Sequence, residues 1–129
     1  MYNKTSLPPA NAHFISTQQA VSMTALYRQN REAILAKNYI EQNILALSET
    51  FNRDAFDELL SKPGCAGIRI YYGMDEALKV HAIAVAVDEN NSDILPNQLT
   101  SEVNTTENFI AEEGQRCPNI CPTASPLNS

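Results

Sequence analysis

Two segments in which apolar and polar residues alternate, 65–72 and 77–88, constrain the fold of this chain more than any other feature. A period of two is typical of β-strands, because successive side chains point to opposite faces of a sheet. The short connection around 73–77 predicts an antiparallel hairpin in which Tyr72 lies opposite Leu78. In this register one face is apolar throughout, and it carries Ala66, Ile68, Ile70, Tyr72, Leu78, Val80, Ala82, Ala84 and Ala86.

The opposite face of the hairpin is polar near its turn, where Arg69, Tyr71, Lys79 and His81 are expected to gather. One interpretation is a surface for a small anion or a partner, with Arg69 as a planar donor and His81 as a pH-sensitive group. The simpler interpretation, which we favour, is a solvated sheet face with ordinary cross-strand pairs.

The region before the hairpin contains helix and strand signals. Ser16 and Gln19 have the spacing of a capping box, which predicts a long helix over residues 17–37. Residues 43–51 alternate and predict a strand that supports the hairpin. The apolar side of the long helix would carry Ala20, Met23, Leu26, Tyr27 and Ile34.

A second, short helix is expected after Asn52, whose side chain can accept a hydrogen bond from the first turn. Pro63 and Gly64 would end it, because proline cannot continue a helix and glycine tolerates a left-handed turn. The chain therefore predicts an α+β fold. An antiparallel sheet of three to four strands would pack against a long N-terminal helix and the short second helix. Residues 108–113 fit either a helical turn or an edge strand.

The same patterns divide the chain into three parts. Residues 1–14 contain two adjacent prolines and read as an extended or disordered segment. Residues 15–115 form the single α+β domain that the length of 129 residues favours. Residues 116–129 contain prolines and two cysteines and are expected to form an extended tail.

Charge and hydropathy exclude several classes of partner. The net charge is −6, and residues 88–129 contain seven acidic residues against a single basic one, Arg116. This balance repels phosphate backbones and argues against nucleic-acid binding. No apolar run approaches the ~18 residues of a membrane span, and residues 1–14 lack the features of a signal peptide. We therefore expect a cytoplasmic protein without a membrane partner.

Cys117 and Cys121 are the sharpest chemical feature of the sequence. Their C-x3-C spacing differs from the C-x-x-C of thioredoxin-like sites. The pair could bind a soft metal such as zinc or cycle between thiol and disulfide, whereas two packed thiols that pin the tail are the simpler interpretation, which we favour. A zinc site built from Cys65 and His81 is disfavoured, because the expected register separates them by about 13 Å.

Three stretches of the sequence, FNRDAFDELL, PGCAGIRIYYGMDEALKVHAIAVAVD and EEGQRCPNICP, together resemble a family of small bacterial proteins of unknown function. Members combine a helix–hairpin core with a C-terminal Cys-Pro-x-x-Cys-Pro ending, and the resemblance covers about residues 15–122. It implies no activity, cofactor or site residue.

Catalytic motifs are missing from the sequence. It contains neither a G-x-S-x-G nucleophile setting nor a phosphate-binding glycine loop. We therefore expect a non-enzymatic binding or assembly module that acts through a protein partner or as a homo-oligomer. One alternative is a metal-binding or thiol redox protein that uses Cys117 and Cys121. The other is a small-molecule-binding protein or enzyme with a site near Arg69, Tyr71 and His81.

Overall fold

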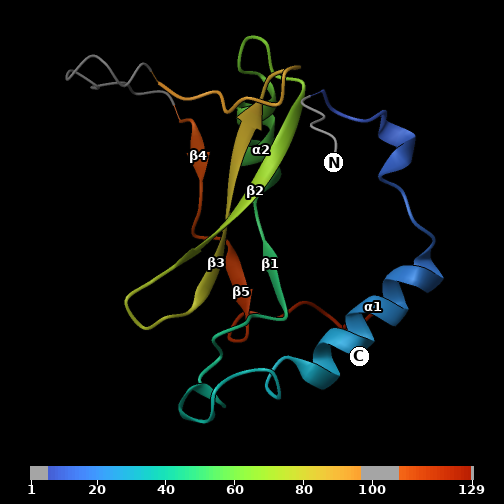
Figure 1. Cartoon of the computed structure of the whole chain (residues 1–129), viewed down its shortest axis with the longest axis vertical. Helices are drawn as coiled ribbons and strands as arrows, with labels where there is room; N and C mark the ends of the chain where they lie inside the picture. Colours follow the sequence, from blue (N-terminus) through green and yellow to red (C-terminus); the bar gives the residue numbers. More distant parts are fainter. Residues whose placement is uncertain (1–5, 97–107, 129) are drawn as a thin grey trace, which may run out of the picture. The chain divides into compact units, whose positions relative to one another are not determined.

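The computed structural model describes residues 6–96 and 108–128 of the chain, and it confirms an α+β fold with antiparallel sheets (Figure 1). The described residues fall into two compact units. Unit 1 comprises residues 6–8, 51–73, 82–96 and 108–114, and unit 2 comprises 9–50, 74–81 and 115–128. In chain order the elements are the 3-10 helix η1 (Ala10–Ala12), α1 (Thr17–Asn30), the 3-10 helix η2 (Lys37–Tyr39), β1 (Ser48–Thr50), α2 (Arg53–Leu60), β2 (Gly67–Met74), β3 (Val80–Val87), β4 (Ile110–Ala111) and β5 (Gln115–Cys117).

A three-stranded sheet in the order β2-β3-β4 and the helix α2 build the core of unit 1. α2 begins as predicted, because the Asn52 side chain accepts a hydrogen bond from the Asp54 amide at 2.7 Å. The helix ends at Leu60, and the chain then turns through Gly64, whose φ is +82°. Leu59 packs against the two fully buried alanines of β3, Ala84 and Ala86, whose small side chains let the helix approach closely.

β4 is the edge strand that residues 108–113 could form, and it pairs antiparallel with β3, where Ala84 lies opposite Ala111. The sheet therefore has three strands, the lower number of the predicted three to four, and the described residues add no fourth strand to it. Val85 and Val87, which point away from the alanine face, are also buried.

The hairpin connection lies two residues later than predicted. β2 continues to Met74 and β3 begins at Val80, so the connection is 75–79, and the Asp75 amide donates to the Lys79 carbonyl at 3.1 Å. The predicted pairing of Tyr72 with Leu78 is therefore wrong. Asp75 causes the shift, because its side chain accepts the amides of Ala77 and Lys79 and fixes the turn there. A displacement by an even number of residues preserves the alternation of the strands, but Leu78 and Lys79, which were expected on the second strand, lie in the connection.

The predicted strand at 43–51 is shorter than expected, and its partner is different. Only β1 forms, and it pairs antiparallel with β5 in a separate two-stranded sheet, where Ser48 lies opposite Cys117. Residues 43–47 do not continue the strand. The carbonyl groups of residues 43–46 accept hydrogen bonds from side chains, as when Tyr27 donates to Ala46 at 2.6 Å and Arg31 donates to Leu45 at 2.6 Å.

The N-terminal helix begins as predicted and ends early. Ser16 and Gln19 form the complete capping box. α1 ends at Asn30 rather than at residue 37, and the Asn30 side chain donates back to the Leu26 carbonyl at 2.9 Å. Such side-chain bonds compete with the helical ladder. α1 contains no buried residue, so its predicted packing against the sheet stays a prediction.

Candidate functional site

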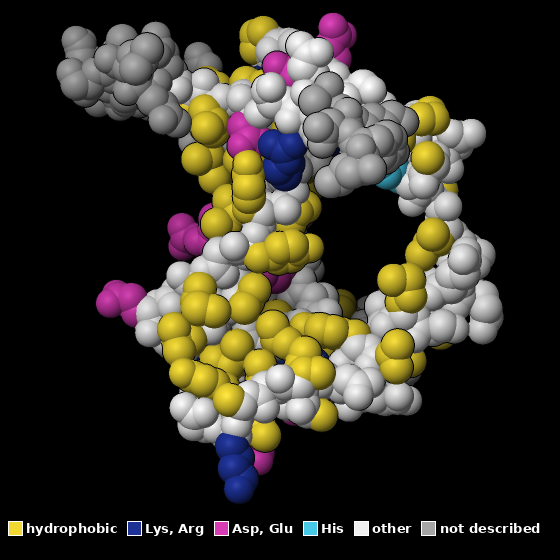
Figure 2. Space-filling model, viewed as in Figure 1, with side chains coloured by type: hydrophobic (Ala, Val, Ile, Leu, Met, Phe, Trp, Pro, Cys, Tyr) yellow, Lys and Arg dark blue, Asp and Glu magenta, His cyan; other side chains and the backbone are white. Residues whose placement is uncertain are grey.

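A shallow apolar groove follows the exposed side of α1. Its lining consists of Met23, Leu26, Tyr27 and Asn30, which we call the α1 stripe, and its volume is about 400 Å³. Met23 is 65% exposed and Leu26 is 61% exposed. Figure 2 shows hydrophobic side chains at the surface along α1. Met23 and Leu26, which the sequence places on the apolar side of the helix, therefore face solvent, whereas Ala20 of that side is half-buried.

The orientation of α1 follows from polar anchors on the helix. The Tyr27 hydroxyl donates to the Ala46 carbonyl at 2.6 Å, and the Arg28 guanidinium donates to the Leu127 carbonyl at 2.7 Å. Burial raises the pKa of the Tyr27 phenol, so the group remains a neutral donor at physiological pH. Four residues on the side of the helix away from the stripe are half-buried: Val21, Thr24, Ala25 and Arg28.

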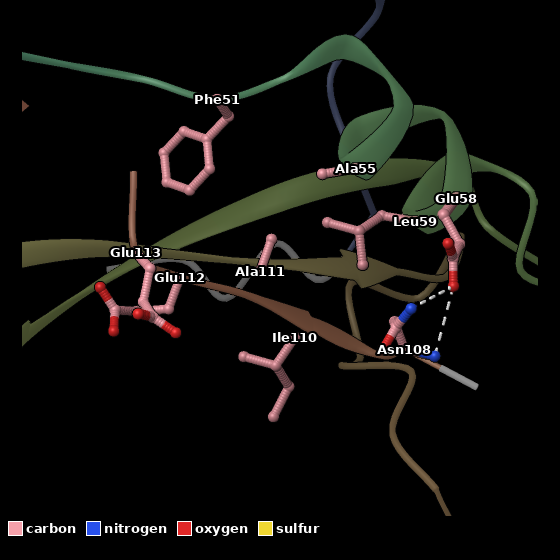
Figure 3. Close-up of a pocket in the computed structure, with 9 residues that line it drawn as sticks. All are labelled: Phe51, Ala55, Glu58, Leu59, Asn108, Ile110, Ala111, Glu112 and Glu113. Atoms are coloured by element: carbon pink, nitrogen blue, oxygen red, sulfur yellow. Dashed lines mark hydrogen bonds between the residues drawn. The ribbon is translucent and has the colours of Figure 1, made fainter. Parts of the chain in front are cut away.

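A second concave site lies in unit 1 between α2 and β4, and we call it the α2–β4 pocket (Figure 3). Its volume is about 270 Å³, and it is lined by Phe51, Ala55, Glu58, Leu59, Asn108, Ile110, Ala111, Glu112 and Glu113. Asn108 donates to the Glu58 carboxylate from its side chain at 2.9 Å and from its amide at 3.3 Å. Figure 3 shows this pair at one end of the pocket and the carboxylates of Glu112 and Glu113 at the other.

The predicted polar cluster of Arg69, Tyr71, Lys79 and His81 does not form as one group. Its members bind two different aspartates, Asp93 and Asp75, neither of which was predicted as a site residue. In unit 1, Arg69 and Tyr71 both donate to the Asp93 carboxylate. Arg69 also donates to the main-chain carbonyl of Asn91 at 2.7 Å and to its side chain at 2.6 Å. The guanidinium thus holds the loop after β3, and its use for an external anion stays a prediction.

In unit 2 the hairpin turn contains the other half of that cluster. The His81 Nε2 atom lies 2.8 Å from an oxygen of Asp75, and the Lys79 amide donates to the other oxygen of that carboxylate at 3.0 Å. The hydrogen bond with His81 is the main cause that lowers the pKa of the Asp75 carboxyl. These contacts organise the turn.

Cys117 and Cys121 form a disulfide, so the expectation of two packed thiols is wrong. The bond closes because the chain folds back after β5, which brings the Cα atoms of the two cysteines within 4.6 Å. Cys117 is buried, whereas Cys121 is exposed. Within residues 6–96 and 108–128, no three His, Cys, Asp or Glu side chains form a group that could hold a metal ion. The remaining cysteine, Cys65, is a free thiol in unit 1.

Sequence reasoning missed the residues that join distant segments. Arg116 donates to the Val80 carbonyl at 3.0 Å, and Glu58 binds Asn108 across fifty positions of sequence. The sequence contained one indication that Arg116 is important, because it is the single basic residue of an acidic segment. The α2–β4 pocket offered none, because its two sides are far apart in the sequence.

No family model, curated protein or solved structure matches this chain. The resemblance to small bacterial proteins with a Cys-Pro-x-x-Cys-Pro ending therefore stays a prediction.

Proposed function

We propose that this protein is a non-enzymatic assembly module that pairs with a second copy of the same chain through the α1 stripe. The observation that carries the proposal is the exposure of Met23 and Leu26 on a helix whose other side is half-buried. Removing such side chains from water is favourable by roughly 25 cal/mol per Å² of apolar area. Pairing of this helix face with another apolar surface would supply that burial.

The absence of charged residues from the first eleven positions of α1 favours a second copy of the chain over a charged partner. Residues 17–27 contain neither an acidic residue nor a Lys or Arg, although the whole chain has a net charge of −6. A charged partner would find no counter-charge on the stripe, whereas two copies meet there without like-charge repulsion. A two-fold arrangement of antiparallel helices places the same residues on both sides of the contact.

The length of the helix limits the strength of the dimer. α1 has 14 residues and is therefore about 21 Å long. Stable interfaces bury roughly 1,200–2,000 Å² in total. The area that one pair of such helices would bury lies near the lower end of this range. We expect reversible dimerisation with a Kd on the order of 10 μM.

Sedimentation velocity at concentrations that bracket this Kd tests the proposal. In the double variant Met23→Glu/Leu26→Glu, like charges would face each other across the two-fold axis, and we expect a monomer at every concentration. The matched control, Gln18→Glu/Gln29→Glu, adds the same two charges at exposed positions of α1 off the stripe and should dimerise like the wild type. Glutamate is a good helix former, so circular dichroism should show the same helix content in all three proteins. A wild-type chain that remains monomeric, or a control that dissociates equally, would refute the proposal.

The disulfide favours a second candidate, a thiol–disulfide role. Disulfides of cytosolic proteins are usually transient and redox-sensing, so a cytoplasmic location would require this bond to cycle. A dithiol reductant would attack the Sγ atom of Cys121, which is an exposed residue, and release the Cys117 thiolate. The reductant would then close on itself and free the Cys121 thiol. Alkylation and mass measurement in graded dithiol buffers give the reduction potential. A value below about −300 mV would identify a purely structural bond and remove this candidate.

A further inference from the structure

The α2–β4 pocket combines an apolar interior with acidic ends, and no part of the proposed assembly uses it. We propose that it binds a small organic cation, namely a primary amine attached to an aromatic or aliphatic body. A volume of about 270 Å³ suits a small ligand, because pockets for larger organic molecules span roughly 300–1,000 Å³.

The middle of the pocket accepts the apolar body of such a ligand. Leu59 is only 1% exposed and supplies a fixed floor, and Ala55 and Ala111 leave space beside it. The Phe51 ring lies at the side of the pocket and is held by a tilted contact with the Phe56 ring, with centroids 5.5 Å apart. A ring or chain bound here loses contact with water on several sides.

The charge of the lining selects the sign of the ligand. Glu58, Glu112 and Glu113 contribute three carboxylates, and the lining includes no Lys or Arg among the described residues. The two hydrogen bonds from Asn108 fix one oxygen of Glu58 in place. An ammonium group would gain charge-assisted hydrogen bonds at either end of the pocket, and the Phe51 ring would favour a cation over its face. A carboxylate or phosphate ligand would meet only repulsion.

Matched probes separate charge recognition from simple apolar burial. We would titrate the full chain with 2-phenylethylamine, with 3-phenylpropanoate and with 2-phenylethanol, and follow backbone amide shifts by NMR. We expect saturable shifts of Ala55, Ala111 and Glu113 with the amine, at least tenfold weaker binding of the alcohol, and no binding of the carboxylate. Equal binding of amine and alcohol, or shifts that avoid these residues, would overturn the proposal.

Glutamine variants test whether the carboxylates of the pocket select the ammonium group. Glu112→Gln/Glu113→Gln keeps the shape of the side chains and should weaken amine binding at least tenfold, while binding of the alcohol is unchanged. The control Glu89→Gln removes an exposed carboxylate of the same unit that does not line the pocket, and it should bind the amine like the wild type. If the double variant retains the wild-type affinity for the amine, the carboxylates do not select the ligand and the proposal fails. The outcome is independent of dimerisation, which involves residues of α1.

Discussion

The Arg116 guanidinium donates to the Ile44 carbonyl at 3.1 Å, and the same carbonyl accepts the Val80 amide at 2.8 Å. Arg116 also binds the carbonyls of Asn43 and Val80, both at 3.0 Å. One side chain from β5 thus satisfies the main chain of the segment before β1 and of the first residue of β3. Asn43 and Ile44 lie outside any helix or strand, so Arg116 supplies hydrogen bonds that a regular ladder would otherwise provide.

Arg116→Ala should lower the free energy of unfolding by about 2–4 kcal/mol, because it leaves half-buried carbonyls without their charged donor. Arg116→Lys should recover less than half of the loss, since an ammonium cannot reproduce the planar fork. Urea denaturation measures both effects. The control is Arg53→Ala, which removes an exposed ion pair with Asp57 and should cost less than about 1 kcal/mol. Equal losses at Arg116 and Arg53 would contradict this role.

Ser16→Ala should destabilise the chain by about 1 kcal/mol, because the Ser16 hydroxyl accepts the Gln19 amide at 3.0 Å at the start of α1. The control Ser22→Ala lies at an exposed position inside the same helix and should be neutral or slightly stabilising. Helix content by circular dichroism and the midpoint of thermal unfolding measure the difference. If the two variants behave alike, the capping box does not determine the start of the helix in solution.

The sequence predicted best those features that depend on neighbouring residues. Ser16 with Gln19, and Asn52 with Asp54, cap helices within three positions, and both caps form as expected. The two strands of the hairpin also form, but burial does not follow their alternation: Ile70 and Tyr72 of the apolar face are 40% and 77% exposed, whereas Val85 and Val87 of the opposite face are buried. The position of the turn depends on a local interaction, since the Asp75 carboxylate accepts the amides of Ala77 and Lys79.

Features that depend on distant residues could not be predicted. Residues 43–51 alternate like a strand, but Tyr27, Arg31 and Arg116 bind the carbonyls of the first half. Only the folded chain brings these donors together. The candidate sites could not be predicted for the same reason. The exposure of the α1 stripe depends on the polar anchors of α1, and the α2–β4 pocket depends on the position of β4.

Acid should loosen the hairpin turn before it affects other parts of unit 2. The pKa of the Asp75 carboxyl is lowered in the folded chain, chiefly by its hydrogen bond with His81. A depressed pKa means that the carboxylate stabilises the fold above its unfolded pKa, and that this contribution is lost as the pH falls through the folded value. The loss should therefore begin near pH 4 and be complete at lower pH. Amide exchange at Ala77 and Lys79 measures it, and Asp75→Asn should show fast exchange already at neutral pH. If these two amides of the wild type stay equally protected when the Asp75 carboxylate is protonated at low pH, this role would be contradicted.

Opening the disulfide should destabilise the chain modestly. The loop from Cys117 to Cys121 is short, so Cys121→Ser should cost about 2 kcal/mol in the chain-entropy model. Cys117→Ser should cost more, because Cys117 is only 5% exposed and the variant buries a hydroxyl in its place. Denaturation with and without a dithiol checks this, since reduced wild type should match Cys121→Ser. Equal stability of the two serine variants would show that the burial of Cys117 is unimportant.

Glu113→Gly should separate stability from ligand binding. Glu113 has a φ of +64°, a left-handed conformation that costs a non-glycine residue roughly 1–2 kcal/mol and glycine little. The variant should therefore unfold at a higher urea concentration, with a gain of up to about 1 kcal/mol after the larger backbone entropy of glycine is subtracted. It also removes a carboxylate from the α2–β4 pocket, so its affinity for 2-phenylethylamine should fall severalfold. Glu113→Gln keeps the strained backbone, so it should lose the affinity without the gain in stability. A glycine variant that is more stable and binds the amine as well as the wild type would show that the side chain at position 113 takes no part in recognition.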